Sequence, residues 1–451
     1  MSDSETPFIG SLGVLRDERF EQAQAMAIEG DREAFGHYLA SAKHGNPAAA
    51  HMVSQYILRN LAEGGLTGAL FWSTYAVLGY RIPAESTLKT ILSSPKAPGA
   101  GEFIDYCIKE AEAGNGAAMF VAGMAYYTGM GAAFDADTAF TYFERSYKAG
   151  NLEGKCQYAL CLIRGAGTRQ DKEKGLGLLK ETAAEGNIRA ALKYAQLLEH
   201  GTFVRKDCGK ALAVYERLAS LRVPRAMYEA GRCYLDGIGT ERDPDMGYSW
   251  FTLSQAFGSV WGDFGMSRCM MGGIVENCRE EGANLMLESA DKGCTDAMIM
   301  ASQLFAKGGK ILKKDPARSL DYLRMAASAG NASAELSLAK MYEDGTGLKR
   351  DGSQSLAYAM RAAAHGSTEG CFMAGTRLVS GKGDSAKGFG LLSMASDEGF
   401  MKATFSLANC YSRGIGTAKN PGKCLELHKE LADRGFAKSM SVIGELYYLG
   451  D

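Results

Sequence analysis

Residues 226–243 read AMYEAGRCYLDGIGTERD, and the same pattern returns as AELSLAKMYEDGTGLKRD at 334–351 and as ATFSLANCYSRGIGTAKN at 403–420. Each copy opens with alanine, has a second small residue five positions later, and has an aromatic residue three positions after that. Residues at i, i+4, i+5 and i+8 share one face of an α-helix, so the pattern predicts a helix at the start of each copy. Gly-x-Gly then ends the helix, because glycine accepts the left-handed conformation of a helix C-terminus, and the Asp or Asn that follows is typical of the cap of a second helix.

The second small residue is the most regular feature of the chain and recurs about every 36 residues. Only Gly, Ala or Ser occupies this position. We expect a second helix to cross there with closely spaced backbones, so that a larger side chain would cost ~1–3 kcal/mol through overpacking. We call these residues the small anchors; they are Ser54, Gly123, Ala159, Ala195, Gly231, Ser267, Ser302, Ala339, Gly375, Ala408 and Gly444.

The second helix of each copy is rich in alanine and ends at another glycine, as in ARSLDYLRMAASAGN from Ala317. A single helical hairpin cannot bury its apolar face alone, whereas stacked hairpins can. The sequence therefore predicts an all-α, superhelical α/α solenoid of roughly twelve two-helix repeats. We expect an N-terminal segment with capping helices, then degenerate repeats, the tandem array and a C-terminal half repeat, at residues 1–48, 49–115, 116–436 and 437–451.

The composition is that of a globular protein, with 46% hydrophobic and 23% charged residues. Fifty basic residues oppose 52 acidic ones, so binding to nucleic acid has no overall electrostatic support. The N-terminus has acidic residues where a secretory signal needs Lys or Arg, and the chain has no run of apolar residues long enough to span a membrane. We therefore expect a cytoplasmic protein with no membrane insertion.

The eleven cysteines show no CxxC motif and no constant pairing from one repeat to the next. Four of them occupy one equivalent repeat position, where other copies have Ala, Leu or Met. A free cysteine behaves as a small buried hydrophobe, so we expect reduced thiols in the core at Cys161, Cys233, Cys269 and Cys410.

These repeats closely resemble the Sel-1-like repeat (SLR) family, which is related to tetratricopeptide repeats. The resemblance rests on the small residue, Tyr, Gly-x-Gly and Asp of residues 226–243 and 334–351, and on the second helices around Tyr142, Trp250 and Tyr322. It covers roughly residues 49–451 and is strongest over 116–451. It implies a right-handed α/α superhelix that serves protein–protein interaction and complex assembly, mostly in bacteria and in eukaryotic signalling or quality control.

None of the recurrent motifs indicates catalysis or cofactor binding. Gly-x-Gly follows a predicted helix, whereas a nucleotide-binding loop follows a strand. One Asp in each repeat cannot supply the oxygen ligands that calcium needs, and the six histidines form no HExxH or Cys/His cluster. We therefore expect a protein that is not an enzyme and has no catalytic residue, cofactor or metal.

By analogy with tetratricopeptide repeats, one side of each first helix would line a concave groove. Its residues lie two positions after the opening residue and four and seven positions further along. One interpretation is a groove with an aromatic floor and central basic residues, which would bind a protein partner that has acidic residues. The alternative is that the aromatic residues pack between repeats and the charges are solvated. The candidate groove residues are Phe120, Tyr127, Tyr228, Arg232, Phe264, Arg268, Lys340, Phe372 and Phe405.

The C-terminal segment SMSVIGELYYLG predicts a first helix without a second one. Its apolar residues Ile443, Leu446, Tyr447 and Tyr448 cannot all be covered by a single neighbouring helix, and contiguous exposed apolar surface usually marks a contact site. We hypothesise self-association or partner docking there; a simple cap is the alternative.

The leading functional hypothesis is a scaffold, adaptor or inhibitor that binds one partner protein along the groove. Through the family resemblance, an immunity protein that neutralises a bacterial toxin is a more specific form of this hypothesis. The alternative from another class is an SLR-type hydrolase of cell-wall or β-lactam substrates. A hydrolase would need a nucleophile and base at one place, and neither is evident in the sequence.

Overall fold

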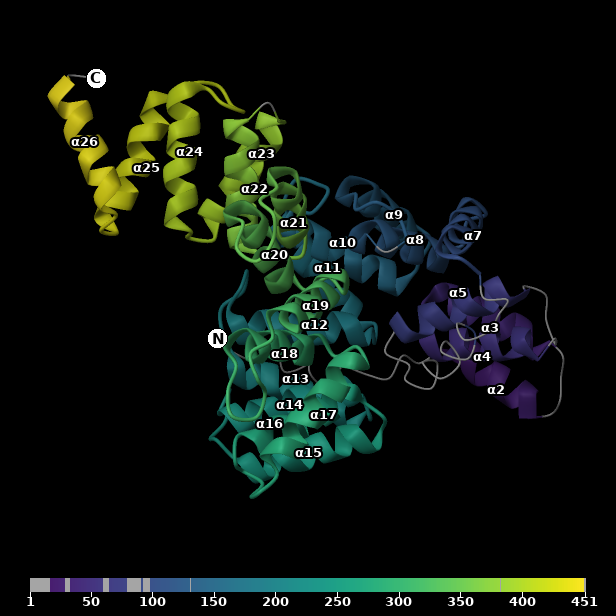
Figure 1. Cartoon of the computed structure of the whole chain (residues 1–451). Helices are drawn as coiled ribbons and strands as arrows, with labels where there is room; N and C mark the ends of the chain where they lie inside the picture. The colour runs from purple at the N-terminus through teal and green to yellow at the C-terminus, as the bar shows by residue number, and fades with distance from the viewer. Residues whose placement is uncertain are drawn as a thin grey trace. The chain divides into compact units, whose positions relative to one another are not determined.

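A computed structural model describes residues 17–28, 33–59, 65–78, 91, 98–129, 131–381 and 383–449. These residues form helices and turns without a strand, as Figure 1 shows. The helices are α2 (Glu18–Ile28), α3 (Ala34–His44), α4 (Pro47–Leu58), α5 (Gly65–Leu78), α7 (Ala100–Glu112), α8 (Gly116–Thr128), α9 (Ala136–Lys148), α10 (Leu152–Arg164), α11 (Lys172–Ala184), α12 (Ile188–His200), α13 (Cys208–Ser220), α14 (Pro224–Asp236), α15 (Pro244–Ala256), α16 (Val260–Met271), α17 (Arg279–Asp291), α18 (Thr295–Lys307), α19 (Pro316–Ser328), α20 (Ala332–Asp344), α21 (Gly352–Ala364), α22 (Thr368–Ser380), α23 (Ser385–Asp397), α24 (Met401–Arg413), α25 (Pro421–Asp433) and α26 (Ala437–Leu449). The predicted all-α repeat fold is confirmed.

The small anchors lie where the two helices of a hairpin meet. Ten of the eleven are buried. A Cβ atom added at Gly231 on α14 would lie 2.7 Å from Phe251 Cε1 on α15, and one added at Gly123 would lie 2.6 Å from Phe143 Cε1. At these two anchors an aromatic ring of the second helix occupies the space of a side chain, and at Gly375 the side chain of Leu392 does so, 2.9 Å from an added Cβ. The exception is Gly444 on α26, which is exposed and has open space around it.

The predicted caps and turns also form. The side chain of Asp243 accepts a hydrogen bond from the backbone N–H of Met246, so it caps the start of α15. Gly237 ends α14 with φ 71° and donates its N–H to the carbonyl of Cys233. The same Asx cap begins other second helices, at Asp135, Asp171, Asp207, Asp351 and Asn420. These repeats are thus defined by local hydrogen bonds at their turns, whereas α17 begins after Cys278, which provides no side-chain cap.

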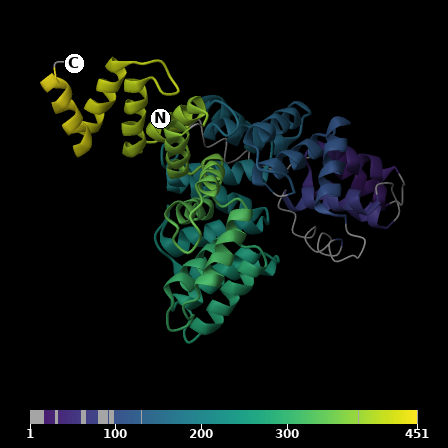
Figure 2. The ribbon, with the colours of Figure 1, turned by 45° about the horizontal axis from the view of Figure 1, so that its top comes forward.

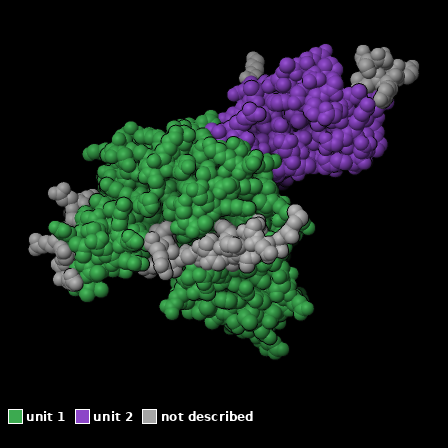
Figure 3. Space-filling model, turned by 180° about the vertical axis from the view of Figure 1, so that it is seen from behind, with its two compact units in different colours: residues 1–163, 171–315 green, residues 164–170, 316–451 purple. Residues whose placement is uncertain are grey.

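The helices group into two compact units, which Figure 3 colours separately. Unit 1 comprises residues 1–163 and 171–315, and unit 2 comprises residues 164–170 and 316–451. Within each unit consecutive helices pack against each other, as α14 does with α15 in unit 1 and α24 with α25 in unit 2 (Figure 1). Figure 2 shows the last helices of unit 2, coloured yellow, following one another in chain order.

The N-terminal helices also pack against their neighbours in the chain. Helices α2 and α3 form a pair within residues 18–46, where we expected a cap. Tyr75 on α5 accepts a hydrogen bond from the buried Asn151 side chain, whose amide also donates to the carbonyl of Lys43. This amide therefore ties the end of α3 and the middle of α5 to the start of α10.

The cysteines behave as core residues. All eleven are free and nine are buried, including the four that share one repeat position. Burial raises the pKa of the Cys233 thiol to about 12 and that of the Cys269 thiol to about 11. Both thiols are therefore neutral near pH 7 and unreactive as nucleophiles. None of the described helices is both long enough and apolar enough to cross a lipid bilayer.

Candidate functional site

The predicted groove residues all lie on first helices, from α8 to α24. First helices of successive repeats touch directly, as α14 does with α16 in unit 1, and α20 with α22 and α22 with α24 in unit 2. The side of each unit that these helices form is called the first-helix face below. The face is built differently in the two units.

In unit 1 the predicted aromatic floor is inside the protein. Tyr228 on α14 is 2% exposed, and its ring lies 5.7 Å from Phe251 on α15 and 6.2 Å from Phe264 on α16. Phe120 likewise packs 6.2 Å from Phe143 and is fully buried. Tyr127 and Phe264 are buried as well. These four rings pack between helices, as the alternative interpretation proposed.

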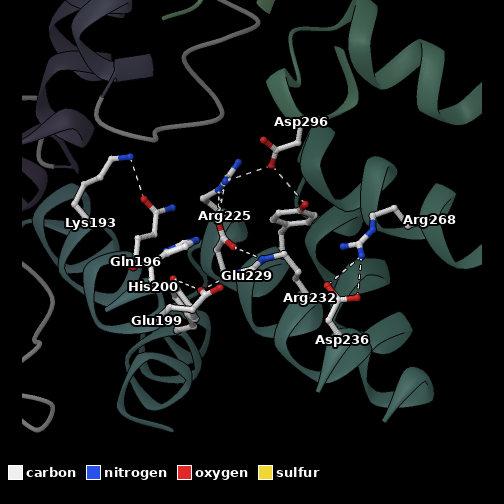
Figure 4. A network of polar contacts seen from close by, with 12 residues as sticks. Lys193, Gln196, Glu199, His200, Arg225, Glu229, Arg232, Asp236, Arg268 and Asp296 are labelled. Atoms are coloured by element: carbon white, nitrogen blue, oxygen red, sulfur yellow. Dashed lines mark hydrogen bonds and ion pairs between the residues drawn. The ribbon is translucent and has the colours of Figure 1, made fainter. Parts of the chain in front are cut away.

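Arg232 on α14 lies in a buried charge network, shown in Figure 4. Its Nη2 lies 2.5 Å from Glu199 Oε2 on α12, and its Nε lies 3.0 Å from Glu229 Oε2 on α14. The Arg232 side chain is 19% exposed, and both glutamates are buried. The guanidinium thus links two repeats, and it donates its hydrogen bonds to carboxylates inside the protein.

Arg225, one turn before Glu229, extends this network along the face (Figure 4). Its Nη2 lies 2.7 Å from Glu229 Oε1 and 3.7 Å from Asp296 Oδ2 on α18. Its guanidinium lies 4.7 Å from the ring centre of Trp261 on α16 and 5.1 Å from that of Tyr228, which is a cation–π arrangement. Side chains from α14 and α18, two repeats apart, therefore meet over α16. Together they cover this part of the first-helix face.

The residues of this network stabilise one another in their ionised forms. Burial alone would raise the pKa of Glu229, but the charges of Arg225 and Arg232 outweigh burial and lower it. Burial opposes the charge of Arg232, yet Glu229 and Glu199 raise its pKa further above its already high value. Two arginines face two buried glutamates, so the cluster is balanced. Neither Glu229 nor Arg232 is poised to exchange a proton near neutral pH, so the network is suited to positioning helices.

The other two predicted basic residues are also paired with acidic residues of neighbouring repeats. Arg268 on α16 donates to both carboxylate oxygens of Asp236 on α14, at 2.9 and 3.1 Å. Lys340 on α20 lies 2.8 Å from Glu369 on α22, with both side chains more than 40% exposed. The repeat pattern identified these three cations but not their acidic partners. For the two arginines the sequence contained a signal of this pairing. An acidic residue stands at the end of the preceding first helix, about 33 residues before each arginine.

In unit 2 the corresponding row of the face is open to solvent. Leu336 on α20, Phe372 on α22 and Phe405 on α24 are all half-buried, in the position that Tyr228 and Phe264 hold in unit 1. Phe372 packs 5.2 Å from Phe400, and the rings of Phe405 and Phe436 lie 5.7 Å apart. One side of each ring is thus held by the core and part of it remains accessible. We call Leu336, Phe372 and Phe405 the open row.

A buried polar cluster in unit 2 lies between its helices. Glu335 on α20 is fully buried and accepts hydrogen bonds from Arg361 Nε on α21 at 3.0 Å, and its other oxygen lies 2.6 Å from His365 Nδ1. These contacts join a first helix to the second helix that follows. Across the described ranges, no group of three or more His, Cys, Asp or Glu side chains could hold a metal ion.

At the C-terminal end, Ile443 on α26 is half-buried and Met440 is 49% exposed. The side chains of Leu446, Tyr447 and Tyr448 lie outside the described part of the chain. The contact site predicted there stays a prediction.

A model of the family described as Sel1 repeat matches the chain in seven segments, at residues 116–151, 153–187, 188–222, 224–254, 295–331, 332–367 and 402–436. These segments cover more than half of the chain. A search of curated protein sequences finds no significant match.

Three solved structures are similar over much of their length. The first is c5321, a protective antigen present in uropathogenic Escherichia coli strains and displaying an SLR fold, with 18% identity and a TM-score of 0.40 over 91% of this chain and 90% of that one. The second is a Sel1 repeat protein from Oxalobacter formigenes, with 20% identity and a TM-score of 0.40 over 68% of this chain and 89% of that one. The third is the immunity protein Pa5087 from Pseudomonas aeruginosa, with 19% identity and a TM-score of 0.34 over 48% of this chain and 81% of that one.

Proposed function

The chain belongs to the Sel1 repeat family, and on this premise we propose that it is a non-enzymatic scaffold or adaptor that binds a partner protein on the first-helix face of unit 2. Proteins of this family generally act in protein–protein interaction. The observation that supports unit 2 as the binding region is the open row of Leu336, Phe372 and Phe405. Half-buried aromatic residues on a rigid helical support are typical energetic centres of protein interfaces.

Unit 1 is less suited to this role at the predicted positions. Its aromatic rings are buried, and Arg225, Arg232 and Arg268 are paired with acidic residues of the same unit. A partner would have to break these pairs in order to use the arginines, which would leave buried carboxylates without a counter-charge. We therefore assign to unit 1 a supporting role and to unit 2 the contact.

The proposal is tested by replacing two rings of the open row with alanine, as Phe372→Ala with Phe405→Ala in the full chain. Proteins retained from a native extract by the immobilised chain would be quantified by mass spectrometry. We expect a specific partner to be lost by a factor of about ten or more, because truncating a central aromatic residue commonly costs 1–2 kcal/mol or more of binding energy. The measurement is accompanied by thermal unfolding of the variant, to show that it is folded.

The matched control is Leu253→Ala on α15 with Phe257→Ala at its C-cap, which removes two apolar side chains that are 41% and 37% exposed. This variant should retain the partner at the level of the unmodified chain. Equal retention by both variants, with both folded, would contradict the assignment of the binding surface.

The more specific roles can be separated in the same system. If the retained partner is a toxin or other effector whose activity falls when the chain is added, the adaptor is an inhibitor or immunity protein. Hydrolysis of a chromogenic β-lactam by the purified chain, abolished by one Ser or His substitution, would support the hydrolase alternative.

A further inference from the structure

Helix α24 carries an exposed stripe with cationic residues at both ends. Lys402, Phe405, Asn409 and Arg413 are spaced by three, four and four residues, so they lie along one face of the helix. The side chains of Lys402, Asn409 and Arg413 are exposed, and Phe405 between them is half-buried. The stripe from Lys402 to Arg413 is about 16 Å long at the helical rise of about 1.5 Å per residue.

The cations of this stripe differ from those elsewhere on the first-helix faces. Among the described residues, no acidic side chain forms an ion pair with Lys402, Arg413 or Lys438, which lies on α26 one repeat after Lys402. All three are exposed. The C-terminal repeats thus present two successive lysines at one repeat position, with Arg413 at the far end of the stripe.

The same repeat position is paired in earlier repeats. Arg189 on α12 lies 2.6 Å from Glu153 on α10, and Arg225 on α14 lies 3.7 Å from Asp296 on α18. Glu369 on α22, again at this position, is paired with Lys340. Lys402 and Lys438 break this pattern, because Glu369, the carboxylate at this position one repeat before Lys402, pairs with Lys340, and no described acidic side chain pairs with either lysine. This local excess of positive charge lies beside the accessible part of the Phe405 ring.

We propose that the α24 stripe, together with Lys438, binds an acidic segment of the partner protein. This inference rests on the proposed function and names the chemistry of its partner. One apolar side chain of the segment packs on Phe405, and its carboxylates face Lys402, Lys438 and Arg413. An extended segment covers the stripe with about five residues, at about 3.3 Å per residue. Charge complementarity of this kind speeds association and sets the register of the bound segment.

A protein segment fits this surface better than a nucleic acid. Salt-dependent binding to a phosphate backbone draws on many contacts, commonly six to ten. The stripe and Lys438 supply three cations, and the chain has a net charge of −2. The half-buried ring of Phe405 offers a contact for a single apolar group.

The test uses a displayed library of short random peptides, selected on the full chain and then synthesised. We expect the selected peptides to place Asp or Glu on both sides of a Phe, Tyr, Trp or Leu. Their affinity should fall at least about tenfold in the double variant Lys402→Glu with Arg413→Glu, and it should weaken with added salt. The matched control is Lys349→Glu with Lys419→Glu, which makes the same change of charge at two exposed lysines in turns of unit 2 and should bind as the unmodified chain does.

Each other outcome overturns the inference. Selected peptides without acidic residues, bound equally well by the charge-reversed variant, would refute the acidic partner and leave the proposed function standing. Displacement of a selected peptide by a single-stranded DNA oligonucleotide at lower concentration than by the free peptide would identify a nucleic-acid site instead. Failure to select any peptide would refute the inference, while the proposed function is judged separately by the native extract and the Phe372 and Phe405 variant.

Discussion

The first-helix faces of unit 1 and unit 2 are built from the same repeat, but one is filled and the other is open. In unit 1, Tyr228 is buried under a network in which Arg225 reaches Asp296 two repeats away. In unit 2, Phe372 and Phe405 hold equivalent positions and are only partly buried. The backbone pattern of anchors, caps and turns is common to both units. The difference therefore comes from the variable residues on the face, which are buried and paired with one another in unit 1 and partly accessible in unit 2.

The buried charges of unit 1 also show what such pairing costs. Removing charges from water is expensive, and a buried ion pair often contributes little net stability compared with apolar residues of similar size. Once the pair is formed, however, the loss of one member leaves a buried charge uncompensated. The network around Glu229 therefore ties neighbouring helices of unit 1 to each other, and the buried Glu335 does the same for α20 and α21 in unit 2, whereas the exposed pair of Lys340 and Glu369 imposes little restriction.

The largest expected effect comes from breaking the buried network in unit 1. Arg232→Ala would leave the buried Glu199 without its arginine and Glu229 with Arg225 alone, and we expect a loss of ~3–5 kcal/mol of stability. Lys340→Ala in unit 2 removes a cation from an exposed pair and should change stability by less than ~1 kcal/mol. Urea unfolding followed by circular dichroism measures both. Similar unfolding midpoints for the two variants would show that the faces do not differ in the way described.

The next effect concerns the small anchors. Gly231→Ala places a Cβ 2.7 Å from Phe251 Cε1, so we expect a loss of ~1–3 kcal/mol through overpacking. Gly444→Ala is the matched variant, because this anchor on α26 has no atom of a neighbouring element within 4 Å. It should stabilise α26 by up to ~1 kcal/mol, since alanine favours a helix over glycine. Thermal unfolding compares the two, and a destabilising Gly444→Ala would mean that the anchor on α26 is covered.

The smallest expected effect is a change of folding stability with pH that is confined to unit 2. Burial lowers the pKa of His428 below its usual 6.5, and its imidazole lies between the Phe405 ring and the Ser439 hydroxyl. Above pH 6.5 the imidazole is neutral in both the folded and the unfolded chain, so the full stability is present. As the pH falls below 6.5, the unfolded chain takes up a proton that the folded chain does not, and stability declines until the folded pKa is reached.

Glu229 provides the contrast in unit 1. Its pKa in the folded chain is lowered, so its contribution is complete above about pH 4.5 and is lost only below that value. Protection factors from hydrogen exchange, which correct for the slower intrinsic exchange at lower pH, should therefore fall between pH 6.5 and pH 4.5 in α25 and not in α14. His428→Leu should remove the response in α25. Persistence of the response in this variant would assign it to another group.

Several features of the site could have been found in the sequence, and others could not. The position of Arg232 and Arg268 on one face follows from the repeat spacing, and the helices α14 and α16 that carry them contact each other. Their acidic partners could have been inferred from Glu199 and Asp236 near the ends of the preceding first helices. The burial of Tyr228 and the partial exposure of Phe405 could not have been inferred from the sequence. Both residues satisfy the same repeat pattern, and only their neighbours in space distinguish them.

By itself, the sequence determined the helices, their caps and turns and the identity of the family, because these depend on short-range hydrogen bonds and on a periodic small residue. Gly231 and Asp243 carry this information within a single repeat. Only the tertiary structure decided which rings are covered and which charges are paired. The contact between Arg225 and Asp296 joins residues two repeats apart, and such contacts depend on how successive helices tilt and stack, which no single repeat encodes.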